Sequence, residues 1–430
     1  MKRSRYLLVG LAAGVVGAAA AQTPTTIPAD ELERAKRAAD VHQLVLERAA
    51  SQPLRHARAR ALSITASAAR YLLATQGADG GWASETGPGI TCLVLRALVQ
   101  NAIVGPQHRS VRRGVEFVLS FRRDDGGIYA AEGLHKNYET SVALSLLSVL
   151  NDPEHRAIRD AATKFLKDNQ WDESEQISVD NPWYGGAGYG SGKRPDLSNT
   201  QMMLEALHDS GLPKDDPTYQ KALAFIQRCQ MLGEQNDQPF AKGASDGGFI
   251  YSPANGGESK AGKWPVDAAG RPTSQPSGGR EELRSYGSMT YAGFKSMLYA
   301  GLSHDDPRVR AALEWIRRNW TLDYNPNMPE KQSHEGLYYY YHVFARALAA
   351  FGEDEIRDAA GRDHAWRVEL SRKLESLQKA DGSWVNEEDR WMEGHPALTT
   401  AYSMLALQAA FPPAGIAPPH GSTRTTQPTP

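Results

Sequence analysis

The sequence has very few cysteines and no excess of either charge. Cys92 and Cys229 are the two cysteines among 430 residues, too few for a thiolate-rich zinc site. Both lie in apolar helical patterns, which favours burial as small hydrophobic side chains over a disulfide. Lys and Arg together number 48, and Asp and Glu together number 50. This balance provides no positive field that would attract nucleic acid or an anionic bilayer.

The sequence also lacks an apolar run long enough to cross a bilayer comfortably. The best candidate, residues 6–16, follows the basic segment 1–5 and precedes small residues that end at Ala21. Segments of this kind in this order predict a signal peptide over residues 1–21, cleaved after Ala21. We therefore expect an exported protein, periplasmic or extracellular, whose mature chain has no transmembrane segment. An uncleaved anchor is the alternative.

The chain does contain an internal repeat, in which six glycine-containing turns each connect two helical patterns. Glycine suits a tight turn that requires a positive φ, and a large side chain after it can pack the two helices together. The turns are Asp79–Trp82, Asp125–Ile128, Gly185–Tyr189, Asp246–Phe249, Glu335–Tyr338 and Asp381–Trp384.

The apolar helices after these turns share one register. Their predicted starts are Thr91, Thr140, Thr200, Thr290, Tyr341 and Thr400, each followed seven residues later by a leucine or methionine. Residues seven apart lie on nearly the same face of a helix. We interpret the threonines as residues that cap or bond back to the first turn, and not as catalysts.

The helices before the turns are amphipathic, and the first is expected at residues 67–75. Amphipathic helices outside and apolar helices inside are what a double-layered barrel requires. The sequence therefore predicts an all-α (α/α)6 toroid of six helical hairpins over residues 60–411. It predicts an insertion loop at 252–283, which could cover one mouth of the barrel. A charged N-terminal helix is expected at 29–50, and a disordered Pro- and Thr-rich tail at 412–430.

Two of the turns carry a resemblance to a known family. The segments Gln76–Trp82 and Gln378–Trp384 resemble the Gln-Trp motif of the prenyltransferase and squalene-oxidase repeat family, which includes squalene–hopene cyclases. The resemblance extends over about 63–411. It implies a single toroid with an apolar central cavity. The family's Asp-x-Asp-Asp acid, its Asp, Cys and His zinc ligands and the thioester run of related toroids are all absent.

Candidate binding residues lie near the starts of the inner helices. The four tyrosines 338–341 point around a helix, so some face the centre, where they can bond a polar ligand or contact a cation. Parallel inner helices also present their N-termini at one mouth, which favours an anion there. The predicted substrate-binding residues are Tyr286, Ser288, Met289, Tyr291, Tyr338, Tyr340, Tyr341, Asn199 and Asp196.

Three residues at the same end are candidates for catalysis. Glu139 and Glu335 are carboxyls whose pKa burial would raise, and His342 directly follows the tyrosines. For each of them, a cap or a surface charge is the competing interpretation. No metal site and no cofactor are predicted.

The sequence leaves three functions open. The first is a terpene-cyclase or mutase-like protein whose partner is an isoprenoid or another apolar small molecule. The second is a non-catalytic protein that binds or organises components of the cell envelope. The third is a carbohydrate-active (α/α)6 enzyme, which would need two carboxyl groups about 5–10 Å apart.

Overall fold

The structure is a computed structural model that describes residues 29–101, 103–190, 192–266 and 281–412, with side chains from Gln52 onward. The chain divides into two units, Met1–Gln52 and Pro53–Pro430. The described part of the first unit is helical and belongs to helix α1 (Ala29–Ala74). The predicted signal peptide and the predicted tail after residue 412 lie outside the described residues. None of the described helices is both long and apolar enough to span a bilayer.

The N-terminal region contains one helix where the sequence predicted two. The predicted helices at 29–50 and 67–75 are both parts of α1, which runs through the intervening residues. Residues 51–66 include four alanines and three arginines, which are strong helix formers. Pro53 is the one helix-breaking residue among them, and it lies at the boundary between the two units.

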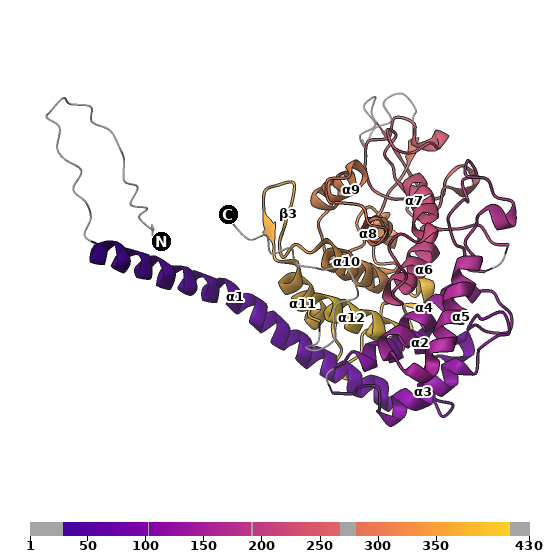
Figure 1. The fold of residues 1–430 in the computed structure, drawn as a ribbon, viewed down its shortest axis with the longest axis horizontal. Helices are drawn as coiled ribbons and strands as arrows, with labels where there is room; N and C mark the ends of the chain where they lie inside the picture. The colour runs from indigo at the N-terminus through magenta and orange to yellow at the C-terminus, as the bar shows by residue number, and fades with distance from the viewer. Residues whose placement is uncertain (1–28, 102, 191, 267–280, 413–430) are drawn as a thin grey trace. The chain divides into compact units, whose positions relative to one another are not determined.

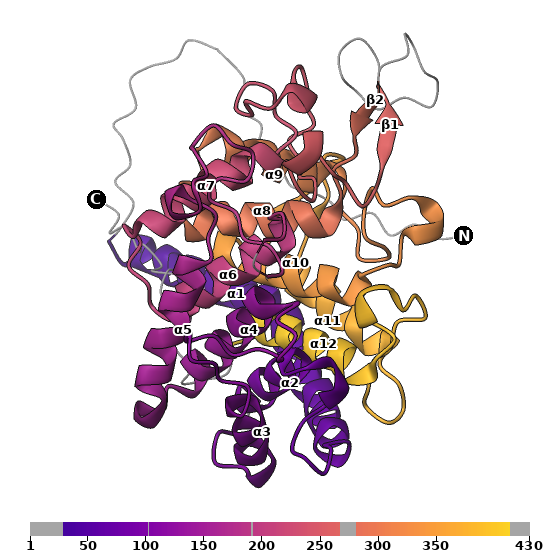
Figure 2. The ribbon, with the colours of Figure 1, turned by 90° about the vertical axis from the view of Figure 1, so that its right-hand side faces the viewer.

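The second unit contains two concentric rings of helices (Figures 1 and 2). Each inner helix packs against the next, and α12 packs against α2, so that the described inner ring is closed. The predicted (α/α)6 toroid is therefore confirmed. The inner helices are α2 (Gly89–Val99), α4 (Lys136–Leu150), α6 (Leu197–Asp209), α8 (Gly287–Tyr299), α10 (Leu337–Phe351) and α12 (Pro396–Ala410). The outer helices are residues 53–74 of α1, α3 (Arg109–Leu119), α5 (Arg156–Asp168), α7 (Pro217–Cys229), α9 (Pro307–Arg318) and α11 (Trp366–Leu377).

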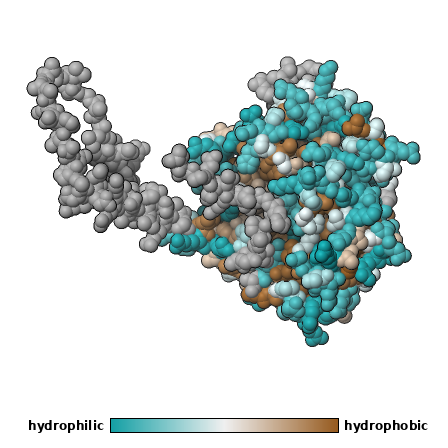
Figure 3. All heavy atoms as spheres, viewed as in Figure 1, coloured by the Kyte–Doolittle hydropathy of each residue, from teal (hydrophilic) through white to brown (hydrophobic). Residues whose placement is uncertain are grey.

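The two rings differ in burial as their sequences predict. Every residue of α2 is buried, whereas α3 buries one face that includes Val111, Val115 and Val118. A helix that is apolar all round belongs inside, and an amphipathic one covers it. Hydrophilic side chains accordingly dominate the face of this unit seen in Figure 3. Cys92 and Cys229 are both buried and free, as expected of small hydrophobic side chains.

The repeated threonines have a role that the sequence did not predict. Thr91 Oγ1 accepts a hydrogen bond from the backbone N–H of Trp82 at 2.9 Å. The equivalent bonds run from Ile128 to Thr140, from Ala187 to Thr200, from Phe249 to Thr290 and from Trp384 to Thr400. None of these threonines is the N-cap of its helix, but the expected bond back to the first turn occurs at Thr200 and Thr290, which donate to the carbonyls of Asp196 and Tyr286. Each threonine anchors the preceding glycine turn to the inner helix, because the turn N–H would otherwise be buried without a partner.

A glutamine at the end of four outer helices anchors the same turns from the other side. The Gln76 amide donates to the carbonyls of Gly80 and Ser110, each at 2.8 Å. The equivalent residues are Gln170, Gln230 and Gln378. We call the glutamine and threonine that hold one turn the turn clamp. Because the glutamine also reaches a neighbouring outer helix, the clamp sets both the angle within a hairpin and the spacing between hairpins.

The same contacts join the last hairpin to the first. The Gln378 amide donates to the carbonyl of Ile64 in α1 at 2.9 Å, across 314 residues of sequence. On the inner ring, the Gln408 amide donates to the Ala97 carbonyl of α2 at 2.8 Å. Hydrogen bonds on both rings therefore lie across the closure.

The predicted insertion at 252–283 is ordered at both of its described ends. Strand β1 (Lys263–Pro265) pairs antiparallel with β2 (Glu281–Leu283), and Trp264 lies opposite Glu282. Figure 2 shows this hairpin beyond the ends of the inner helices. Residues 267–280 lie outside the described residues. A second short antiparallel pair joins β3 (Ile356–Arg357) to β4 (Asp363–His364).

The closure makes a testable contribution to stability. Gln378→Ala leaves two carbonyl groups without their donor, so we expect the free energy of unfolding to fall by about 1–3 kcal/mol. Chemical denaturation monitored by circular dichroism measures this change. Gln107→Ala, which alters an exposed glutamine, is the control. Equal effects of the two substitutions would contradict a role of Gln378 in ring closure.

Candidate functional site

A cavity of about 550 Å³ lies at the N-terminal ends of the inner helices. All six contribute to its wall from their first two turns, and the loops between hairpins complete it. The lining residues on the inner helices include Ile90, Tyr138, Glu139, Ser198, Asn199, Met202, Ser288, Met289, Tyr339, Leu398 and Tyr402. From the loops come Leu134, Tyr189, Tyr251, Tyr286, Trp391, Met392 and Glu393, among others. The toroid is thus hollow at this mouth.

Six tyrosines and one tryptophan line the cavity, together with four glutamates and several small or aliphatic side chains. The ring of Tyr339 contacts that of Tyr402 edge to face at 6.0 Å between centroids, and Tyr402 shares a hydroxyl hydrogen bond with Tyr138. Aromatic rings linked in this way form a fixed wall with apolar faces and a few hydroxyl groups. Such a wall suits a largely apolar molecule and also a positive charge, which is attracted to ring faces.

Glu139 is a buried carboxyl in this wall. Its Oε2 accepts the backbone N–H of Ala130 at 2.8 Å. Gly87 makes room for the other oxygen, because a Cβ at that residue, whose φ is +94°, would lie 2.6 Å from Oε1. Burial raises the pKa of Glu139, and the bond from Ala130 offsets only part of that effect. Glu139 can therefore hold a proton nearer to neutral pH than an ordinary glutamate.

Glu393 is a second buried carboxyl, and sequence analysis did not predict it. Its two oxygens accept the backbone N–H groups of Tyr339 at 2.7 Å and Tyr338 at 3.1 Å, at the start of α10. The Asn386 amide donates a third bond at 2.7 Å. Burial raises the pKa of Glu393 to about 7 in spite of these donors. Because its acceptor sites are occupied, Glu393 positions the first turn of α10.

An adjoining cavity of about 430 Å³ shares Tyr189, Tyr251 and Trp391 with the first. Its wall also contains Asp196, which accepts the Asn199 N–H at 2.9 Å as the N-cap of α6. Burial raises the pKa of Asp196 to about 6, although its hydrogen bonds with Asn199 act in the opposite direction. Three cationic side chains, Lys193, Arg194 and Lys260, complete the polar part of this wall.

The predicted site residues separate into two groups in the structure. Glu139, Asn199, Tyr286, Ser288 and Met289 line the first cavity, and Asp196 lines the adjoining one. The other predicted residues, Tyr291, Tyr338, Tyr340, Tyr341, Glu335 and His342, are not among the residues that line either cavity.

Each member of the second group has another contact. The Tyr340 and Tyr341 hydroxyls donate to the carbonyls of Thr321 and Leu322, both at 2.7 Å. Tyr338 donates to the Val385 carbonyl at 3.4 Å, and Tyr291 packs edge to face on Tyr340. Glu335 is paired with Arg390. His342 is buried and stacks on Tyr402.

Tyr339, the one tyrosine of the four that was not predicted as a binding residue, is the one that lines the cavity. The threonine register contains the signal that identifies it. The residue two positions before each predicted inner-helix start is Gly89, Tyr138, Ser198, Ser288, Tyr339 or Leu398, and all six line the cavity. Since the register residue faces the turn, the residue two positions before it faces the barrel axis.

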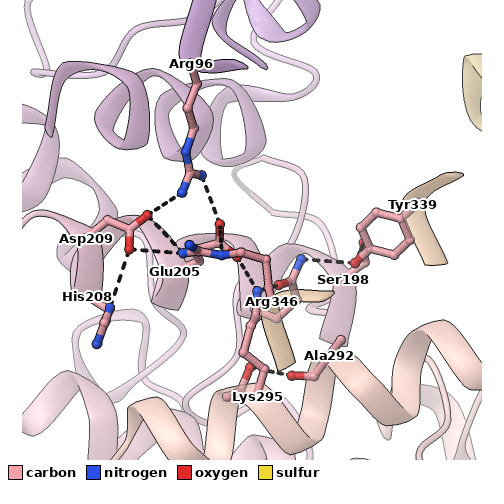
Figure 4. A network of polar contacts seen from close by, with 11 residues as sticks. Arg96, Ser198, Glu205, His208, Asp209, Ala292, Lys295, Tyr339 and Arg346 are labelled. Atoms are coloured by element: carbon pink, nitrogen blue, oxygen red, sulfur yellow. Dashed lines mark hydrogen bonds and ion pairs between the residues drawn. The ribbon is translucent and has the colours of Figure 1, made fainter. Parts of the chain in front are cut away.

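Beyond the cavity, a cluster of buried charges crosses the axis of the barrel (Figure 4). The expected hollow centre therefore does not extend to this level. We call Arg96, Glu205, Asp209, Lys295 and Arg346 the ion cluster. Arg96 lies 2.9 Å from Glu205 and 2.6 Å from Asp209, and Arg346 lies 3.1 Å from each of these carboxylates. Lys295 is paired with Glu205.

The cations of the ion cluster hold its two carboxylates in their ionised forms, whereas burial lowers the pKa of Lys295 although Glu205 opposes that effect. Burial alone would raise the pKa of Glu205, but the positive charges of Arg346, Lys295 and Arg96 outweigh it and keep that pKa well below its usual range. The three cations of the ion cluster exceed its two carboxylates by one formal positive charge. No group of three or more His, Cys, Asp or Glu side chains placed to hold a metal ion occurs among the described residues.

Comparison with known proteins identifies the fold. No protein-family model matches the sequence, and no curated protein matches it. Among solved structures, a ligand-free variant of the type II terpene cyclase MstE from Scytonema superposes with a TM-score of 0.52 at 14% identity, over 83% of this chain and 98% of that one. A second MstE variant, in complex with its substrate geranylgeranyl dihydroxybenzoate, gives 0.51 at 12% identity over 83% and 99%. A third, with the product merosterolic acid A, gives 0.50 at 13% identity over 83% and 99%. The protein thus has a terpene-cyclase-like toroid fold.

The buried histidine beneath the cavity predicts a pH dependence of stability. Burial lowers the pKa of His342 to about 3, so between pH 6.5 and 3 the unfolded chain binds a proton that the folded protein does not. The contribution of His342 to the free energy of unfolding is fully present above pH 6.5. It decreases by about 1.4 kcal/mol for each pH unit as the pH falls from 6.5 towards 3. We expect His342→Gln to reduce the slope of unfolding free energy against pH between pH 6 and 4 by about this amount. Denaturant titrations at several pH values measure it.

The control for this experiment is His334→Gln, at an exposed histidine of the loop before α10. It should leave the slope close to that of the unmodified protein. A slope that His342→Gln does not change would mean that the buried imidazole does not control acid stability.

Proposed function

We propose that the protein binds an isoprenoid, or a similarly long apolar molecule, in the cavity at the mouth of the toroid. The observation that carries the proposal is a cavity of about 550 Å³ that all six inner helices line and whose wall contains six tyrosines and one tryptophan. Cavities of roughly 300–1,000 Å³ with apolar walls and few polar groups are typical small-molecule sites. Asn199, Tyr286, Ser288 and Met289 are the predicted binding residues that contact the ligand in this proposal.

The likeness to MstE supports the choice of ligand class. A variant of that cyclase has been solved in complex with a geranylgeranyl compound, and its toroid superposes on this one. The aromatic side chains of the wall favour the same chemistry, because stacked and edge-on rings give an apolar chain a large contact area. The cavity lies above the ion cluster, so a ligand enters from the mouth and does not pass through the barrel.

In this proposal Glu139 exchanges a proton with the bound ligand, as in an isomerase of the cyclase or mutase type. Burial raises its pKa, and a raised pKa makes the carboxylate a better base and the carboxyl a weaker acid. Such a group suits protonation of a ligand oxygen, or removal of a proton next to a carbocation. It is less suited to protonating an isolated alkene, for which the chain has no Asp-x-Asp-Asp acid.

Filling the cavity tests the binding proposal. Met202 lines the wall and is 5% exposed, so Met202→Trp places a large ring in the space that the ligand would occupy. We expect the affinity for farnesol, measured by tyrosine and tryptophan fluorescence titration, to fall at least about tenfold, because each 1.4 kcal/mol of lost contact is a factor of ten. Mass spectrometry of lipid that co-purifies with the protein should show a parallel loss.

Met202→Leu is the matched control, because it nearly conserves side-chain volume. It should bind farnesol as the unmodified protein does. If the unmodified protein binds no isoprenoid, or if Met202→Trp binds it equally well, the ligand site is not in this cavity. Binding of oligosaccharides in place of isoprenoids would favour a carbohydrate-active protein.

Removing the acid separates catalysis from binding. Glu139→Gln keeps the size of the side chain and should leave affinity for the ligand within about twofold, while conversion of the bound isoprenoid falls by about 10²–10⁴-fold, as for other general acids and bases. Gas chromatography with mass spectrometry of extracted ligand follows conversion. If Glu139→Gln does not change the rate, Glu139 is not the proton-transfer group. If the unmodified protein converts nothing, the non-catalytic function is favoured.

A further inference from the structure

Two hydroxyl groups, those of Tyr339 and Ser198, form a pair in the cavity wall. Both residues line the cavity, and their oxygens lie 3.1 Å apart. The Gln201 side chain, fully buried behind them, has its Nε2 3.0 Å from the Tyr339 hydroxyl. The Gln201 Oε1 in turn lies 2.5 Å from the ammonium of Lys295. A chain of hydrogen bonds therefore connects the cavity wall to the ion cluster (Figure 4).

The direction of this chain is determined at its buried end. A lysine ammonium can only donate, so the oxygen of Gln201 must face Lys295 and its NH₂ must face Tyr339. The amide therefore donates to the Tyr339 hydroxyl oxygen. The flipped amide would place its NH₂ against the Lys295 ammonium, where two donors would face each other.

Because the Gln201 amide donates to Tyr339, one of the two hydroxyl protons of Tyr339 and Ser198 has no acceptor among the described residues. Tyr339 and Ser198 carry two O–H groups, and the single bond between them uses one. In the described part of the chain no further acceptor contacts either oxygen, so whichever hydroxyl donates within the pair, the other retains a proton to donate. Because both side chains line the cavity, this second O–H is available to a molecule inside it.

The ion cluster strengthens that donor. Its three cations and two carboxylates leave one formal positive charge, and Lys295 is fully buried, where electrostatic interactions are strong. Hydrogen bonds in a chain polarise one another, so a cation at one end makes the O–H at the other a better donor. Hydrogen bonding from Gln201 and Ser198 lowers the pKa of Tyr339, although burial dominates and raises it.

We propose that the Tyr339–Ser198 pair donates a hydrogen bond to an acceptor oxygen of the ligand. The natural ligand is then an oxygenated isoprenoid, such as an ether, an epoxide, a ketone or an alcohol, and not a plain hydrocarbon. Tyr339 and Ser198 are binding residues in this assignment. Gln201 and Lys295 are positioning residues that act through them. The inference rests on the proposed function, because it requires an apolar molecule in this cavity.

Two probes of nearly the same shape test the inference. Farnesyl methyl ether has one oxygen that can only accept a hydrogen bond, and a farnesene has the same chain without oxygen. Both probes are delivered from cyclodextrin, and binding is measured by fluorescence titration. The ether should bind the unmodified protein about tenfold more tightly than the hydrocarbon, because a hydrogen bond from a buried donor contributes about 1.4 kcal/mol, which is a factor of ten in affinity. The double substitution Tyr339→Phe with Ser198→Ala should abolish this preference and leave farnesene binding unchanged.

Gln201→Glu gives a sharper test, because it reverses the direction of the chain without removing either hydroxyl. A carboxylate there accepts from Lys295 and also from the Tyr339 O–H. Ser198 then donates to Tyr339, and no proton remains for the ligand. We expect Gln201→Glu to lose the preference for the ether while farnesene affinity stays within about twofold.

The matched control is Tyr340→Phe, which removes a buried hydroxyl of the same tyrosine run whose bond is to the Thr321 carbonyl. It should keep the full preference for the ether. If the unmodified protein binds ether and hydrocarbon equally, or if Gln201→Glu keeps the preference, this inference is wrong while the proposed function stands. If neither probe binds, the proposed function itself is wrong.

Discussion

The hydrogen bonds of the turn clamp set the geometry on which the rest of the toroid depends. Hydrophobic burial explains why apolar helices lie inside amphipathic ones, but it does not fix their angle. The glutamine and threonine do so, because a glycine turn held at its carbonyl by one and at its N–H by the other has little freedom left. The complete clamp holds four of the six glycine turns. The N-terminal turns of the six inner helices lie at one mouth, and the cavity is the space that they enclose.

The ion cluster decides where that space ends. Burying charges is costly unless each has a partner, and replacing such a cluster with apolar side chains often stabilises a protein. Here the charges come from α2, α6, α8 and α10, so they tie opposite sides of the inner ring together. They also give the floor of the cavity a polar connection through Gln201. The buried charges cost stability, but they orient the Gln201 hydrogen bond, which a floor of apolar side chains could not do.

Much of this architecture could be predicted from the sequence, because glycine turns and the threonine register repeat. The same register could have identified Tyr339, because the residue two positions before each predicted inner-helix start lines the cavity. Glu393 could not be found in this way, since it reaches the start of α10 from 54 residues further along the chain. The ion cluster was also unpredictable. Arg96 and Glu205 are 109 residues apart, and each alone resembles an ordinary charge at the end of a helix.

The hydrogen bond between Gln378 and Ile64, which closes the ring, also constrains how the protein folds during synthesis. Linear repeat arrays can fold from any point and add units in order, but a ring has no completed wall until its last hairpin meets its first. The two bonded residues are 314 positions apart, which corresponds to roughly 15–60 s of synthesis at the usual rates. During that interval the early inner helices have only one neighbouring inner helix at the open edge, with apolar surface exposed. A chaperone that covers this edge until the C-terminal hairpin arrives would therefore raise the yield of closed rings.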